Sequence, residues 1–201
     1  MYKITIRDRL LLLGTVLLAG FLIAAGLNGL TSLAIWIYTI GFGILLVACL
    51  LLIILGFEGL ESQAVVTVST AIPLCTSLGL VSVHIPSLFI PYLVFCILGF
   101  GITGFTKLTL ANKASTLVLA LVHGVAGLII VILPLSMVIT GTSHPGYLLV
   151  SLGGALIGLA GLLLTFLKAG KPILSQETIY RLLPVILFLM SLSFVGGFFF
   201  L

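Results

Sequence analysis

The most regular feature of the chain is a series of seven long apolar segments separated by short polar or Gly/Pro-rich breaks. A helix that crosses the hydrocarbon core of a bilayer needs about 20 predominantly apolar residues. The segments have this length, and they cover residues 10–28, 33–56, 64–82, 87–105, 115–140, 147–167 and 178–200. The pattern predicts an all-α integral membrane protein, a single polytopic domain built as a bundle of seven transmembrane helices with short loops.

The composition excludes a water-soluble domain. Hydrophobic residues make up 62% of the chain, charged residues only 6%, and the mean hydropathy is +1.49. A soluble domain has roughly a quarter of its residues charged. The few basic residues stand between apolar blocks and do not form the cluster that binds phosphates, so we expect no nucleic-acid partner. The expected surroundings are the lipid bilayer.

The basic residues also predict an orientation. If all seven segments cross, the amino terminus and the loops near 57–63, 106–114 and 168–177 share one side, and every Lys and Arg falls on that side. They are Lys3, Arg7, Arg9, Lys107, Lys113, Lys168, Lys171 and Arg181. The positive-inside rule then places the N-terminus inside and the C-terminus outside. We expect a bacterial inner membrane or an equivalent energy-transducing membrane.

Two segments have an alternative assignment. The first is longer than the apolar region of a signal peptide, which is about 7–15 residues, so we expect an uncleaved helix. The third contains several hydroxyl side chains around Pro73, and hydropathy alone allows a re-entrant piece. In that case Lys107 and Lys113 would lie opposite the other six basic residues, which favours a full crossing.

Four hydroxyl side chains and one proline of the third segment follow one helix face at positions i, i+1, i+4, i+7 and i+8. They are Ser69, Thr70, Pro73, Thr76 and Ser77, and we call them the hydroxyl stripe. The proline frees a backbone carbonyl at membrane depth, so this stripe is a candidate lining for a solute path. In the simpler interpretation the hydroxyls bond to their own helix or to a neighbouring one.

Small residues recur at spacings of three or four in the sixth segment, and Gly154 with Gly158 forms a GxxxG motif. The full set is Ser151, Gly154, Gly158, Gly161 and Thr165. Such a seam lets two helix backbones approach closely. We favour a partner helix from the same chain, and a helix of another protein is the alternative.

His123 is the one ionisable residue that this assignment places well inside the membrane, which makes it a candidate functional site. Three chemistries are open: an interhelical hydrogen bond, which we favour; a proton relay or substrate contact; and an axial bond to haem or chlorophyll. Ala120 and Gly127 on the same face leave room for a helix or a flat macrocycle. The sequence itself requires no cofactor.

His84 and His144 lie in turns on the opposite side, each shortly before a proline. Together they would supply half of a metal site. The outer loops have no Asp, Glu or Cys as a third ligand, so solvated turn histidines are the simpler interpretation.

No HExxH, GxxxxGK[ST] or GxSxG motif occurs, and the short loops leave no room for a soluble catalytic domain. We therefore expect no enzyme. The leading hypothesis is a non-catalytic multi-pass subunit or assembly factor of a larger membrane complex, in contact with a cofactor or pigment at His123 as an extension. Its expected partners are membrane proteins or further copies of the chain. The alternatives are a small-solute transporter or channel that uses the hydroxyl stripe with His123, and a lipid-acting enzyme at the membrane surface.

Overall fold

The computed structural model describes residues 3–25, 29–109, 113–168, 170 and 172–201, and every regular element among them is helical. The long helices are α1 (Ile6–Ala25), α2 (Ser32–Leu55), α3 (Gln63–Ser69), α4 (Ala71–His84), α5 (Phe89–Thr109), α6 (Lys113–Ile139), α7 (Leu148–Lys168) and α8 (Gln176–Phe198). Short 3-10 helices precede or follow them: η1 (Gly56–Glu61), η2 (Pro86–Leu88) and η3 (Pro145–Tyr147). With α3 and α4 counted as one span, the described residues contain seven spans that are long and apolar enough to cross a membrane, as the sequence predicts.

The first helix begins at Ile6, earlier than its predicted start at residue 10, because two polar side chains cap it. The Asp8 amide donates to Thr5 Oγ1 over 3.2 Å, and the Thr5 amide donates back to Asp8 Oδ2 over 2.8 Å. This reciprocal arrangement is a capping box, which stabilises a helix start without apolar residues. The helix is described to Ala25, and the predicted continuation to residue 28 lies outside the described residues.

The third predicted span, for which the sequence also allowed a re-entrant piece, consists of two helices. They meet at Thr70, between α3 and α4. Pro73 has no amide hydrogen, so the carbonyl of Ser69 loses the bond that a regular helix would give it. Just before the proline, the Thr70 amide donates to the carbonyl of Thr67, three residues earlier, over 3.1 Å. This bond is shorter in sequence than the four-residue bond of a regular α-helix. Helices α6 and α8 remain continuous through Pro134 and Pro184.

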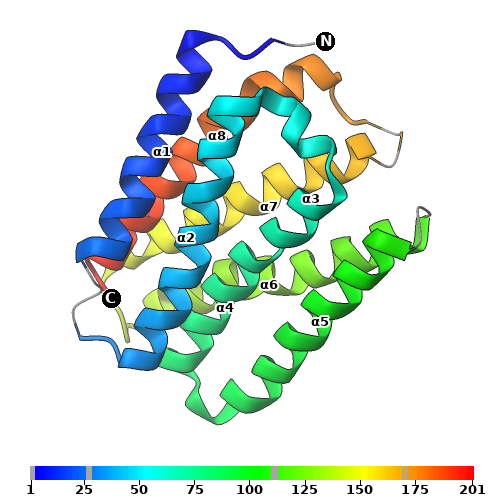
Figure 1. The fold of residues 1–201 in the computed structure, drawn as a ribbon. Coiled ribbons are helices and arrows are strands. Elements are labelled where there is room, and N and C mark those ends of the chain that lie inside the picture. The colour runs from blue at the N-terminus through cyan, green and yellow to red at the C-terminus, as the bar shows by residue number, and fades with distance from the viewer. Residues whose placement is uncertain (1–2, 26–28, 110–112, 169, 171) are drawn as a thin grey trace.

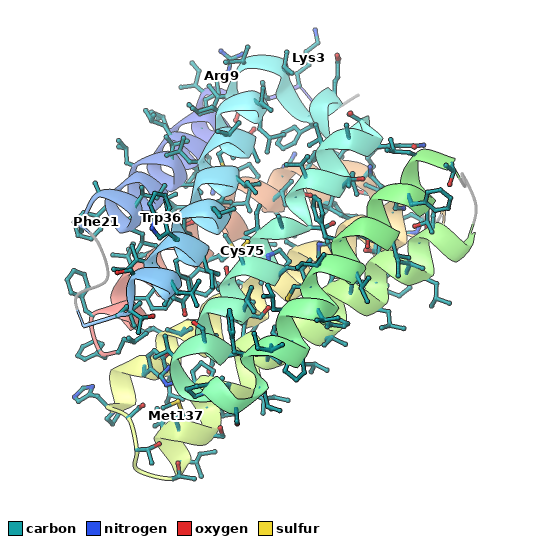
Figure 2. The ribbon with its side chains drawn as sticks, turned by 60° about the horizontal axis from the view of Figure 1, so that its bottom comes forward. Lys3, Arg9, Phe21, Trp36, Cys75 and Met137 are labelled. Atoms are coloured by element: carbon teal, nitrogen blue, oxygen red, sulfur yellow. The ribbon has the colours of Figure 1, made fainter. Side chains whose placement is uncertain are left out.

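The helices form two layers (Figure 1). One layer contains α1, α2, α3 with α4, and α5; the other contains α8, α7 and α6. Successive spans run in opposite directions, so the N-terminus and C-terminus lie at opposite ends of the bundle. Figure 2 shows Lys3 and Arg9 at the first end and Met137, near the end of α6, at the other.

Aromatic rings fill the space between α2 and α8. Tyr38 and Phe198 meet edge to face with ring centroids 5.0 Å apart, and Phe42 packs on Phe194 in the same way at 5.9 Å. These rings are almost fully buried. A Cβ atom on Gly79 of α4 would lie 2.5 Å from the Tyr38 ring, so only glycine fits beside it. This half of the bundle is close-packed and rigid.

At each end of the bundle, a contact between residues distant in sequence joins two helices. At the N-terminal end, Phe57 of η1 stacks on Tyr180 of α8 with centroids 5.0 Å apart. At the opposite end, His84 Nε2 lies 2.7 Å from the hydroxyl of Tyr147, which joins α4 to η3. These contacts fix the layers that position the site described next.

Candidate functional site

Two cavities meet at His123, between the layers and along the boundary of α6 and α7. The larger one encloses about 420 Å³, and its walls are rich in glycine. The smaller one encloses about 70 Å³ and extends toward Leu60 and Lys168 at the N-terminal end of the bundle. His123, Gly161 and Thr165 line both cavities, so this group of three residues is the junction of the site.

The larger cavity exists because α6 and α7 diverge. Toward the end of the bundle that carries the C-terminus they are in close contact: a Cβ on Gly154 would lie 2.5 Å from Ile130 Cγ2, and the Ser151 hydroxyl donates to the Val131 carbonyl over 2.8 Å. One turn further along α7, no atom lies within 4 Å of the Cβ position of Gly158. The predicted small-residue seam therefore has two roles. Ser151 and Gly154 pack against α6 where the cavity ends, with Gly154 also part of its lining, and Gly158, Gly161 and Thr165 form the cavity wall.

The cavity opens sideways. Leu128 on α6 and Leu159 and Leu162 on α7 form part of its lining, and all three side chains are exposed on the outside of the bundle. In a membrane, this outer surface faces the acyl chains. We call the larger cavity, between Gly124, Gly127, Gly158 and these leucines, the α6–α7 groove.

The imidazole of His123 has one engaged nitrogen and one available nitrogen. Its Nδ1 lies 3.1 Å from the carbonyl oxygen of Leu119, one turn earlier in α6. A carbonyl only accepts, so in the neutral ring Nδ1 carries the hydrogen and Nε2 carries a lone pair. Within the part of the chain that the structure describes, no group is hydrogen-bonded to Nε2. The Cδ2 edge of the ring lies against Gly161, 3.9 Å from its Cβ position.

Thr165 supplies a second available polar group. Several other threonines in the helices donate to a carbonyl one turn earlier, as Thr15 does to Leu11 and Thr106 to Ile102. The Thr165 hydroxyl makes no hydrogen bond with any described residue. Ser69 lines the smaller cavity nearby, with its hydroxyl donating to Val66 O over 2.9 Å. The junction thus combines an acceptor from α6 with a hydroxyl from α7.

The members of the predicted hydroxyl stripe do not share one surface, because they have different surroundings. Pro73 reaches the base of the groove, while three members are buried and donate to their own helix: Thr70 to Val66, Thr76 to Ile72 and Ser77 to Pro73. Ser77 also accepts a hydrogen bond from the Tyr92 hydroxyl of α5 over 2.8 Å. The simpler interpretation of these hydroxyls, bonding to their own or a neighbouring helix, agrees with this geometry.

His84 and His144 have separate partners. His84 is bonded to Tyr147, as described above, whereas His144 Nδ1 accepts from the Gly146 amide over 3.0 Å and its ring stacks on Phe200 at 4.6 Å. The described residues contain no group of three or more His, Cys, Asp or Glu side chains arranged to hold a metal ion. His144 is exposed and His84 is partly exposed, and the ring contacts of both depend on residues distant in sequence.

Sequence reasoning missed two parts of the site. It assigned Thr165 to packing only, and it took Lys168 as an orientation signal, although Lys168 lies at the mouth of the smaller cavity and donates to the Leu60 carbonyl. A helical wheel of α7 would have placed Thr165 on the same face as Gly158 and Gly161. No protein-family model matches the chain, and no curated protein or solved structure matches it either.

Proposed function

We propose that this chain is a non-catalytic, multi-pass subunit or accessory factor of a larger membrane complex, and that it holds a lipid-phase ligand or cofactor in the α6–α7 groove. The observation that carries the proposal is the sideways opening of the groove, rimmed by exposed leucines, with the available Nε2 of His123 inside. A ligand enters such a site from the bilayer and not from water.

The distribution of the basic residues supports one orientation of the chain in the membrane. The basic residues that the structure describes belong to the end of the bundle that carries the N-terminus, as Lys3 and Arg9 show in Figure 2. By the positive-inside rule this end faces the cytoplasm or its equivalent, and the C-terminus faces outward. The proposed location is a bacterial inner membrane or an equivalent energy-transducing membrane.

The transporter alternative is less well supported. It needs a path between both aqueous sides, and the smaller cavity does extend from His123 toward the N-terminal end. At the other end, the contact of Gly154 with Ile130 closes the boundary of α6 and α7. A cavity that is closed at one end and open to lipid favours binding over passage.

The lipid-acting enzyme is also less well supported, because the described residues that line the two cavities include no carboxylate to orient His123 as a general base.

Haem or chlorophyll, the pigments considered for His123, would bond to Nε2, the nitrogen with the lone pair. His84 and His144 have partners elsewhere, so such a pigment would have one axial histidine from this chain.

The decisive experiment is extraction of the chain from its native membrane in mild detergent, followed by native mass spectrometry of the particle. We expect the chain in stoichiometric association with other proteins. The same measurement is made on two variants. Gly158→Leu fills the groove, and Gly101→Leu is the matched control, since its Cβ position on α5 is equally open but lies outside the groove. Migration of the wild-type chain alone or as a homo-oligomer would refute the subunit role in favour of the transporter.

A further inference from the structure

We infer that the α6–α7 groove binds a neutral lipid-phase ligand with a hydroxyl-bearing head, whose hydroxyl donates to Nε2 of His123 and whose apolar tail follows the glycine-lined wall. The inference rests on the proposed function and specifies the chemistry of its ligand. It concerns binding only, and no bond to the ligand is made or broken.

The need for a hydroxyl follows from the protonation of His123. Because Nδ1 donates to Leu119, Nε2 is an acceptor, and none of the described residues supplies a donor to it. An acceptor deprived of water without a partner carries a desolvation penalty. A ligand hydroxyl removes this penalty. The Thr165 hydroxyl, which also lines the junction, both donates and accepts, so it provides a second bond to the same head.

The head must be uncharged because of its depth. His123 is ten residues after Lys113, the first residue of α6, which corresponds to about 15 Å along a helix axis. A charged group at this depth in a membrane is strongly disfavoured. Lys168 lines the smaller cavity and donates to the Leu60 carbonyl, and it is not among the residues that line the groove.

The size of the groove favours a head of one ring or less. A dry cavity of about 150 Å³ in another protein holds one benzene molecule. The 420 Å³ of the groove therefore accommodates about three such volumes, enough for a single-ring head and the first part of a tail. A tetrapyrrole has four pyrrole rings and their substituents and exceeds this space.

The wall suits an apolar tail. No atom lies within 4 Å of the Cβ positions of Gly124, Gly127 and Gly158, so these glycines leave a smooth channel between the helices. Leu128 and Leu162 continue the apolar surface to the outside of the bundle, where a longer tail extends among the acyl chains. Two sources share this chemistry: an isoprenoid quinol and a lipid alcohol such as diacylglycerol.

The test uses the purified full-length chain in phosphatidylcholine nanodiscs and measures equilibrium binding of radiolabelled probes. The probes are a short-tailed benzoquinol kept reduced, the corresponding quinone, and diacylglycerol. The quinone has the same ring but no hydroxyl to donate. We expect the quinol to bind roughly fivefold more tightly than the quinone, the value of one neutral hydrogen bond.

The variants test separately the residues that contact the ligand head and those that contact its tail. His123→Phe should remove the preference for quinol over quinone, and Thr165→Val should weaken quinol binding. Gly158→Leu should weaken binding of both, whereas Gly101→Leu should leave binding unchanged because that position is open but outside the groove. If His123→Phe does not fold, the Gly158→Leu and Gly101→Leu pair still tests the site.

Binding of either hydroxyl probe with this dependence supports the inference, and the probe that binds identifies the source. Failure of both probes, or binding that neither His123→Phe nor Gly158→Leu alters, overturns it. A Soret shift on hemin titration that requires His123 also overturns it, in favour of a tetrapyrrole. A chain that travels in a complex but binds neither probe would refute this inference alone, whereas a chain that binds a probe but travels alone would refute the subunit role alone.

Discussion

The two glycines of the GxxxG motif should respond in opposite ways to the same substitution. Gly154→Ala places a methyl group 2.5 Å from Cγ2 of Ile130 and 3.1 Å from its backbone carbonyl carbon. Ile130 is completely buried and branched at Cβ, so its side chain has no free rotamer to adopt. Helices α6 and α7 must therefore separate, which also stretches the bond from Ser151 to Val131.

The magnitude follows from these contacts. Overpacking of a tight core costs about 1–3 kcal/mol, and a lost interhelical hydrogen bond about 0.6 kcal/mol. The higher helix propensity of alanine returns at most about 1 kcal/mol. We expect Gly154→Ala to lower the free energy of unfolding by about 1–2 kcal/mol. Gly158→Ala meets no atom within 4 Å, so it should be neutral or stabilising by up to about 1 kcal/mol.

Reversible unfolding by sodium dodecyl sulfate in mixed micelles, followed by circular dichroism, measures both free energies in the same background. Gly158→Ala is the matched control, since it is the same change one turn away on the same helix. Equal losses for the two variants, or a stabilised Gly154→Ala protein, would show that α6 and α7 are not in contact at Gly154 and that the groove does not end there.

Three further predictions test other parts of the structure. Thr5→Ala removes the capping box of α1 and should cost about 1 kcal/mol in the same unfolding assay, with faster amide exchange confined to the first turn. A double-mutant cycle of His84→Phe and Tyr147→Phe should give a coupling of about 0.6 kcal/mol, and a zero coupling would contradict their 2.7 Å contact. Cysteines introduced at Ser62 and Ser87, at opposite ends of the third span, should differ in labelling by an impermeant maleimide on intact cells, with only Ser87→Cys reactive; the reverse result would invert the proposed orientation.

The number and approximate limits of the spans were predictable because the length of an apolar segment is set by bilayer thickness. The effect of each proline on its helix was not predictable. Pro73, Pro134 and Pro184 all interrupt helical hydrogen bonding, but only the first divides its helix. In membranes, freed carbonyls are satisfied by neighbouring helices, side chains or local adjustments, and these partners come from packing between segments distant in sequence.

The candidate site was predictable only in part. An ionisable side chain inside an apolar segment marks a functional candidate on energetic grounds, and this singled out His123. The different roles of Gly154 and Gly158 were not visible, since both satisfy the same motif and the point where α6 and α7 diverge depends on the whole bundle. The bond between His84 and Tyr147 spans 63 residues and has no local signal.

An available polar atom does not by itself mark a ligand site. The hydroxyls of Tyr38, Thr103 and Ser191 are also buried without a hydrogen-bond partner among the described residues, so this chain does bear the cost of unpaired polar groups elsewhere. Each of those atoms is fully enclosed by packed side chains, which leaves no room for a ligand. His123 and Thr165 differ because both residues line a cavity, whose lining also includes leucines exposed on the outside of the bundle. The combination of an unsatisfied group with accessible volume, and not the histidine alone, is what distinguishes the α6–α7 groove from the rest of the bundle.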